Sequence, residues 1–168
     1  MDWVASMGAP KGERDVVRDG FKVNEITVDG LPLLKPPYGA ITAIDLTRGE
    51  IAWRIAHGET PDNIRNHPAL KGLTLPRTGQ IGKLAALVTK TLLVIGDPQV
   101  TTDAAGRRGA MLRAYDKASG AELGAVFMPG GQVGSPMTYQ LGGRQYIVLA
   151  IGGGNVRAEF IAFRLPKA

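Results

Sequence analysis

The sequence predicts an all-β protein: an incomplete β-propeller of two to three four-stranded antiparallel blades, with one short helix in an inserted loop. Three observations lead to this prediction. The 168 residues include 23 glycines and 11 prolines, which leave little room for long helices. A strand, turn and strand pattern recurs along the chain. Each later copy is preceded by a second apolar hairpin, and two hairpins per unit give the four strands of a propeller blade.

The N-terminal segment, residues 1–30, is weakly patterned, and we expect the partial blades to occupy residues 31–168. Within this segment, residues 21–28 alternate between apolar and polar side chains with a period of two, as an edge strand does. Residues 31–39 (LPLLKPPYG) are rich in proline and predict an extended loop, in which neither a helix nor a central strand fits.

The repeated unit begins in residues 39–53 (GAITAIDLTRGEIAW) as a strand, a tight turn and a second strand. Asp45 can accept hydrogen bonds from the backbone of the turn, and Gly49 can supply the positive φ that closes it. We expect Trp53, in the second strand, to be a packing wedge between blades.

Two further copies of this unit follow. Residues 109–124 repeat it 71 positions later, with Asp116 and Gly120 in the corresponding places. A degenerate third copy, residues 160–165, has Arg164 in place of the aspartate. The last copy stops after its third strand, so these blades do not close a ring by themselves.

Each later copy follows an additional hairpin, at residues 84–96 and 135–151. In the second of these hairpins, Gly142 and Gly143 fit a two-residue turn with positive φ at both positions. Residues 146–151 are apolar on both faces and predict a strand buried on both sides.

The spacing between the first two copies exceeds the length of one blade, and residues 56–83 account for the excess. We interpret them as an inserted loop with one short helix, with Thr60 as its N-cap and Pro61 as its first residue. His57 and His67 flank this helix without the spacing of a metal-ligand pair, and we expect both to be loop residues.

Composition excludes several classes of function. The chain has no cysteine and only two histidines, which excludes thiolate chemistry and nearly excludes a multi-histidine metal site. The net charge is +5, but basic residues such as Arg107, Arg108 and Arg113 are scattered and aromatic residues are few. We interpret them as a solvated basic surface and expect no nucleic acid partner. No run of 18 apolar residues is present, so no membrane span is expected, and the first residues do not form a signal peptide.

The pattern of Ala43, Asp45, Gly49 and Trp53 resembles the tryptophan-docking motif of quinoprotein propellers. These are the dehydrogenases for alcohols and glucose that depend on pyrroloquinoline quinone (PQQ), and the likeness is strongest to the branch of the membrane glucose dehydrogenases. Longer stretches that share the resemblance are residues 31–39, 66–79, 134–139, 145–148 and 152–154.

The resemblance implies that the chain corresponds to the C-terminal part of an eight-bladed propeller in the periplasm. Such enzymes oxidise alcohols or aldose sugars, with electrons passing to PQQ, a Ca²⁺ ion polarising the quinone and an aspartate acting as base. The base and the calcium ligands are expected in earlier blades, so we assign no catalytic or metal residue here. Asp45 and Asp116 match turn positions. The chain alone is therefore expected to be inactive and to bind neither PQQ nor Ca²⁺ tightly.

The candidate cofactor-binding residues are Gly152, Gly153, Gly154 and Asn155, at the end of an apolar strand. Glycines at this position let the backbone approach a flat ring closely. A plain glycine turn between strands is the alternative. In sugar-oxidising relatives a histidine often follows a glycine pair at the place of Gly154, which puts glucose in doubt as the substrate.

Two other functions are alternatives to the dehydrogenase. One is a stand-alone β-repeat scaffold that assembles with itself and binds no quinone. The other is a small enzyme or ligand binder that uses the glycine-rich strand end, which is disfavoured because no paired acid–base or metal constellation is present. The dehydrogenase and the scaffold hypotheses both predict that an open edge at residues 146–151 or 160–165 is covered, by the remaining blades or by self-association.

Overall fold

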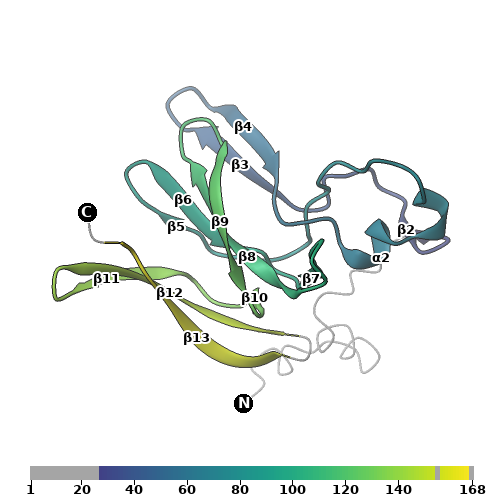
Figure 1. The fold of residues 1–168 in the computed structure, drawn as a ribbon. Coiled ribbons are helices and arrows are strands. Elements are labelled where there is room, and N and C mark those ends of the chain that lie inside the picture. Colours follow the sequence, from purple (N-terminus) through teal and green to yellow (C-terminus); the bar gives the residue numbers. More distant parts are fainter. Residues whose placement is uncertain (1–26, 154–155, 167–168) are drawn as a thin grey trace, which may run out of the picture. The chain divides into compact units, whose positions relative to one another are not determined.

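The computed structural model describes residues 27–153 and 156–166, and these residues form mostly antiparallel β-structure (Figure 1). The chain divides into two compact units, Met1–Lys35 and Pro36–Ala168. None of the helices in the described part is long and apolar enough to cross a membrane.

The first unit contains a short hairpin of β1 (Thr27–Val28) and β2 (Leu31–Pro32). Most of the predicted edge strand at residues 21–28 lies outside the described residues. The proline-rich segment, predicted to be a loop throughout, begins with β2. A two-stranded hairpin tolerates this, because each of its strands has a free edge at which the missing N–H of proline breaks no ladder.

The second unit contains three antiparallel sheets that follow one another in chain order (Figure 1). The first sheet pairs β3 (Ala40–Asp45) with β4 (Glu50–Ala56). The second sheet has the order β5 (Leu87–Val88), β6 (Leu92–Gly96), β8 (Arg108–Asp116) and β9 (Glu122–Met128), with β7 (Thr101–Thr102) beside the start of β8. The third sheet has the order β11 (Met137–Leu141), β12 (Arg144–Gly153) and β13 (Val156–Arg164), with β10 (Gly131–Gln132) beside the end of β12.

Among the described residues, only the second sheet has all four strands of a blade. The first sheet has the last two strands and the third has the first three, which confirms the predicted incomplete propeller.

The predicted turns are confirmed in both full copies of the repeat. Asp45 accepts hydrogen bonds at 2.9 and 3.3 Å from the second and third N–H groups after it, and Gly49 has a φ of 70°. Asp116 accepts the equivalent bonds at 3.1 and 2.8 Å, and Gly120 has a φ of 75°. The glycine pair 142–143 joins β11 to β12 with φ values of 57° and 72°.

Trp53 joins the first sheet to the second, as the sequence predicted. Its indole Nε1–H donates to the carbonyl oxygen of Lys117 at 3.1 Å, in the turn between β8 and β9. Its ring lies against Gly120, so closely that a Cβ on this glycine would be 2.8 Å from the ring. The turn glycine therefore serves both the backbone conformation and the docking of the indole.

A hydrophobic core joins the second sheet to the third. Its fully buried members are Val94, Ala110, Leu112, Met128, Leu149 and Ile151. On β12, Leu149 and Ile151 are buried, whereas Val148 and Ala150, which alternate with them, are half-buried. The prediction that residues 146–151 are buried on both faces therefore holds for one face only, because no sheet among the described residues packs against the other face.

The inserted loop contains α2 (Asp62–Arg65) and a 3₁₀ turn, η2 (Pro68–Leu70). The prediction that Thr60 is the N-cap is wrong. Pro61 occupies that position without a side-chain capping bond, and the helix begins at Asp62. The Thr60 hydroxyl is used elsewhere: it donates to the carbonyl oxygen of Pro76 at 3.3 Å and accepts from the N–H of Thr78 at 3.2 Å. It thereby ties the two ends of the insert together.

The two turn glycines provide a matched test of the docking of Trp53. Gly49→Ala introduces only backbone strain, because nothing lies within 4 Å of the new Cβ, and should cost about 1 kcal/mol in the free energy of unfolding. Gly120→Ala carries the same strain and also displaces the indole, so we expect a loss of about 2 to 4 kcal/mol. Denaturant titration monitored by tryptophan fluorescence measures both losses. Equal losses would show that the indole does not depend on this glycine.

Candidate functional site

The connections of the three sheets gather on one side of the second unit, which we call the loop face. The tight turns at residues 46–49, 117–120 and 142–143 lie at the opposite ends of the strands (Figure 1). Because neighbouring strands are antiparallel, the segments that leave β4, β6, β9 and β12 emerge together. Hydrogen bonds join these segments. His57 Nε2 donates to the carbonyl oxygen of Gly96 at 3.0 Å, and the backbone N–H of Gln132 donates to the carbonyl oxygen of Asp97 at 2.9 Å.

Two of the predicted cofactor-binding residues lie on the loop face. Gly152 and Gly153 end β12, with a register shift between Ile151 and Gly153. Gly153 has a φ of 88°, and no atom of the described residues lies within 4 Å of the position that its Cβ would occupy, so with respect to these residues its backbone is open to a neighbouring group. Gly154 and Asn155 lie outside the described residues. We call Gly152 and Gly153 the glycine segment. It has the open backbone that close approach of a flat ring requires.

A cavity of about 290 Å³, here called the Gln80 cavity, lies on the same face. Residues that line it include Gly39, His57, Gln80, Gly82, Ile95 and Pro98. Its edge is continuous with the glycine segment: Gly131 pairs with Gly152, and a Cβ on Gly131 would lie 2.5 Å from the carbonyl oxygen of Pro98. Only glycine allows these two connections to approach so closely.

The side chain of Gln80 is 2% exposed and only partly satisfied. Its Oε1 accepts from the backbone N–H of Gln99 at 3.1 Å, which fixes the orientation of the amide, because the flipped amide would place two donors together. Its Nε2 has no partner among the described residues. A buried amide group without an acceptor is costly, so this donor marks a place that a further polar group would complete.

His57 forms part of the same wall and is 5% exposed. Its Nε2 faces the carbonyl oxygen of Gly96, which can only accept, so this nitrogen carries the proton and Nδ1 accepts from the hydroxyl of Tyr115 at 3.1 Å. Burial lowers the pKa of His57 and outweighs the opposing effects of Gly96 and Asp97. His57 is a loop residue as predicted, but the sequence did not show that it is buried and neutral.

Arg113 is the centre of a charged cluster that the sequence did not predict. Its side chain is 2% exposed, so the interpretation of Arg113 as part of a solvated surface is wrong. Asp97, which is fully buried, accepts from Nε at 2.7 Å and from a terminal nitrogen at 2.9 Å. Glu59 and Glu122 accept from the other side of the guanidinium at 2.7 and 3.1 Å. A buried guanidinium is tolerated here because each of its edges meets a carboxylate.

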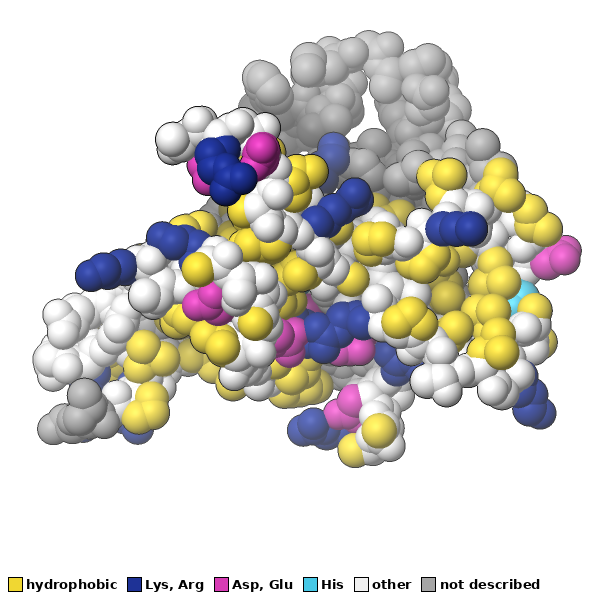
Figure 2. Space-filling model, turned by 90° about the horizontal axis from the view of Figure 1, so that it is seen from above, with side chains coloured by type: hydrophobic (Ala, Val, Ile, Leu, Met, Phe, Trp, Pro, Cys, Tyr) yellow, Lys and Arg dark blue, Asp and Glu magenta, His cyan; other side chains and the backbone are white. Residues whose placement is uncertain are grey.

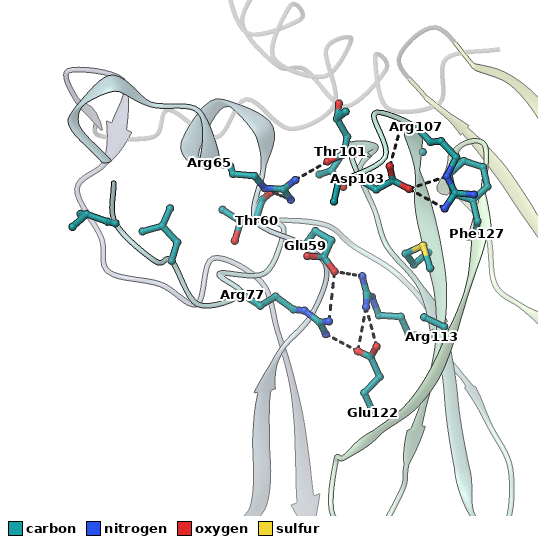
Figure 3. Close-up of a pocket in the computed structure, with 17 residues that line it drawn as sticks. Glu59, Thr60, Arg65, Arg77, Thr101, Asp103, Arg107, Arg113, Glu122 and Phe127 are labelled. Carbon is teal, nitrogen blue, oxygen red and sulfur yellow. Dashed lines mark hydrogen bonds and ion pairs between the residues drawn. The ribbon is translucent and has the colours of Figure 1, made fainter. Parts of the chain in front are cut away.

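Arg77 completes the cluster by bridging Glu59 at 3.5 Å and Glu122 at 2.5 Å (Figure 3). We call Glu59, Arg77, Asp97, Arg113 and Glu122 the Arg113 cluster. Burial alone would raise the pKa of Glu122, but the hydrogen bond from Arg77 and the charge of Arg113 outweigh it and lower the pKa. Glu122 is therefore held in its charged form.

Four members of the Arg113 cluster, all except Asp97, line a larger pocket of about 600 Å³ between the insert and β8–β9 (Figure 3). On its far wall the guanidinium of Arg107 lies 4.9 Å from the ring centroid of Phe127 and forms an ion pair with Asp103 at 2.9 Å. The charged side chains of this pocket are largely engaged with one another. Within residues 27–153 and 156–166, no group of three or more histidine, aspartate or glutamate side chains is placed to hold a metal ion.

The surface charges in view are dispersed. Figure 2 shows Lys and Arg side chains spread over this face, with acidic and hydrophobic side chains among them. Arg48 pairs with Glu50 and Arg108 with Asp62, so several of the scattered basic residues are locally neutralised. The basic side chains of the described residues in this view are therefore interspersed with acidic and apolar ones.

The buried neutral state of His57 predicts a pH dependence of stability. The folded-state pKa lies below the ordinary value of 6.5, so the unfolded chain binds a proton first as the pH falls. The free energy of unfolding should therefore be highest above pH 6.5 and decrease below it, by up to about 1.4 kcal/mol per pH unit. His57→Gln should flatten this decrease between pH 7.5 and 5, whereas His67→Gln should retain it. Denaturant titrations at several pH values would contradict the assignment if both variants followed the wild type.

Comparisons with known proteins agree with this architecture. Residues 7–147 match the family model described as "Glucose/ethanol/alcohol dehydrogenase, beta-propeller domain", named PQQ. The quinate/shikimate dehydrogenase (quinone) of Acinetobacter baylyi is 31% identical over 161 residues, which cover 88% of this chain and 18% of that protein. A probable quinate dehydrogenase (quinone) of Xanthomonas campestris pv. juglandis is 34% identical, covering 83% of this chain and 17% of that protein. The quinoprotein glucose dehydrogenase of Escherichia coli is 30% identical, with coverages of 82% and 17%.

The chain thus spans less than a fifth of the length of these relatives. Its repeated Asp and Gly turns and the docking of Trp53 on Gly120 give the family match a physical basis. The chain belongs to the PQQ β-propeller family of the quinoprotein dehydrogenases.

Proposed function

We propose that this chain forms the C-terminal blades of a PQQ-dependent dehydrogenase that oxidises alcohols or polyols. The observation that carries the proposal is the position of the glycine segment: in a chain of this family, Gly152 and Gly153 end a buried strand on the loop face, with open space beside Gly153. The alternative of a plain glycine turn does not account for the orphaned amide of Gln80 on the same face.

In this proposal PQQ supplies the redox chemistry, and the protein supplies binding and orientation. The backbone of Gly152 and Gly153 contributes a surface that the flat cofactor can approach closely, and Gly154 and Asn155 continue the proposed binding segment in the sequence. The Nε2 of Gln80 offers a hydrogen-bond donor that an oxygen-rich ligand could satisfy. The base that takes the proton of the substrate hydroxyl, and the ligands of the Ca²⁺ ion, belong to other blades. The family resemblance also supports a periplasmic location.

The substrate class is the part of the proposal that the relatives inform most. The names of two similar proteins refer to quinate, a third refers to glucose, and another is a glycerol dehydrogenase large subunit. All of these substrates carry several hydroxyl groups. Because Gly154 stands where sugar-oxidising relatives often have histidine, we propose a polyol of the quinate type rather than glucose.

The third sheet indicates how the blades are completed. β13 pairs with β12 on one side, and no strand of the described residues pairs with its other side. In the complete second sheet β9 occupies this place. Phe160, on β13, is 81% exposed. We propose that an extended strand from the remaining blades covers this edge, since a bare edge with an exposed aromatic residue would promote aggregation. Pairing with a second copy is the alternative.

A chimera tests the proposed function. The region of the E. coli quinoprotein glucose dehydrogenase that matches this chain is replaced by this chain, and PQQ binding and dye reduction are measured with quinate, glycerol and glucose. We expect the chimera to bind PQQ and to oxidise a polyol, and we expect the isolated chain to show no dye reduction with PQQ and Ca²⁺. Gly153→Val should weaken PQQ binding at least about tenfold, because it fills the open space with a branched side chain and strains the positive φ.

Gly142→Val in the chimera is the control, since it places the same strain in a turn that lies away from the loop face. Equal effects of the two substitutions would contradict the role of the glycine segment. Saturable dye reduction by the isolated chain would contradict the need for further blades.

A further inference from the structure

The insert that follows β4 is anchored to the second sheet at both of its ends, residues 57–59 and 77–80, which we call its roots. Glu59 lies three residues after the end of β4, and Arg77 lies three residues before Gln80. Both belong to the Arg113 cluster: Glu59 accepts from Arg113 at 2.7 Å, and Arg77 bridges Glu59 and Glu122 (Figure 3). The two roots are therefore joined to each other and to the buried guanidinium by charge.

The same roots form the wall of the Gln80 cavity. The backbone N–H of Gln80 donates to the carbonyl oxygen of His57 at 2.8 Å, and the N–H of His57 donates to that of Gly39 at 3.0 Å. A Cβ on Gly39 would lie 1.8 Å from the carbonyl oxygen of Gln80, and one on Gly79 would lie 2.1 Å from that of Gly39. With backbones this close, a small displacement of either root changes the shape of the cavity.

The middle of the insert is held separately. Asp62 accepts from the backbone N–H and the hydroxyl of Thr102, and Arg65 donates to the carbonyl oxygen of Thr102 at 2.6 Å. These contacts fix α2 to the segment around β7. They do not involve residues 57–59 or 77–80, so the position of the roots depends on the Arg113 cluster, on the Thr60 hydroxyl, which bonds to Pro76 and Thr78, and on the main-chain bonds of the cavity wall.

We propose that Glu59 and Arg77 are positioning residues for the cofactor: their bridge to Arg113 sets the roots of the insert and thereby the shape of the Gln80 cavity. The proposal rests on the proposed function for the identity of the ligand. Both side chains are 36% exposed, so their pairing contributes little to global stability. Its effect is local, because it restrains two segments whose backbones are already in contact at glycine.

The test compares two double variants. Glu59→Gln with Arg77→Met removes the bridge, whereas Arg48→Met with Glu50→Gln removes an ion pair of the same composition in the exposed turn between β3 and β4. Amide hydrogen exchange is measured in the full chain without cofactor. We expect exchange at Gln80 to become about tenfold faster or more in the first variant and to be unchanged in the second, with similar denaturation midpoints. Similar exchange at Gln80 in both variants would overturn the inference.

PQQ titration of the chimera gives the second readout. We expect the first double variant to bind PQQ about tenfold more weakly than the wild type, the control to bind normally and Arg77→Lys to recover part of the affinity by keeping the charge. If the first double variant does not fold, Glu59→Gln alone, which keeps the shape of the side chain, should show both effects in weaker form. Unchanged affinity in the bridge variants would overturn the inference. A wild-type chimera that binds no PQQ would instead overturn the proposed function, while faster exchange at Gln80 would still report the role of the bridge.

Discussion

The contact between Arg113 and Asp97 connects most parts of the second unit. Asp97 follows β6, and its carboxylate accepts from Nε and one terminal nitrogen of the Arg113 guanidinium on β8. The main chain of Asp97 makes two further hydrogen bonds. Its N–H donates to the carbonyl oxygen of Met111 in the second sheet, and its carbonyl oxygen accepts from the N–H of Gln132 at the start of the third sheet. Next to it, Gly96 accepts from His57 in the insert. One buried ion pair thus lies where two sheets and the insert meet.

Such a pair constrains the structure more than it stabilises it. Removing two charges from water costs several kcal/mol, and their attraction offsets this only when every donor and acceptor is matched. Here five charged groups satisfy one another, with Glu59 and Arg77 at the partly exposed edge and Arg113 and Asp97 inside. A displaced root of the insert would leave part of the buried guanidinium without a partner. The cluster therefore favours one arrangement of the loop face over its alternatives.

The local features of the fold could be predicted from the sequence, because their causes lie within a few residues. Asp45 and Gly49 define a turn by themselves, and the same spacing in Asp116 and Gly120 identifies the repeat. The docking of Trp53 followed from the family motif.

Long-range features could not be predicted in this way. Arg113 looked like other scattered basic residues, although its place within the apolar strand GAMLRAY was a signal that it needs a buried partner. Its partners come from distant positions along the chain, and their convergence depends on the fold. Thr60 has the chemistry of an N-cap, but its hydroxyl bonds to the other root of the insert. Tertiary contacts override local preference at both positions.

The two joints between the sheets are built differently. The first joint uses the Trp53 indole in a turn and the hydrogen bonds of His57, whereas the second joint relies on a continuous hydrocarbon core and has Gly124 in the place of the tryptophan. Hydrocarbon burial carries the heat-capacity change of unfolding, and a single aromatic contact carries little of it. Within the second unit, we therefore expect the second and third sheets to unfold together, and the hairpin of β3 and β4 to separate from them at a smaller free-energy cost.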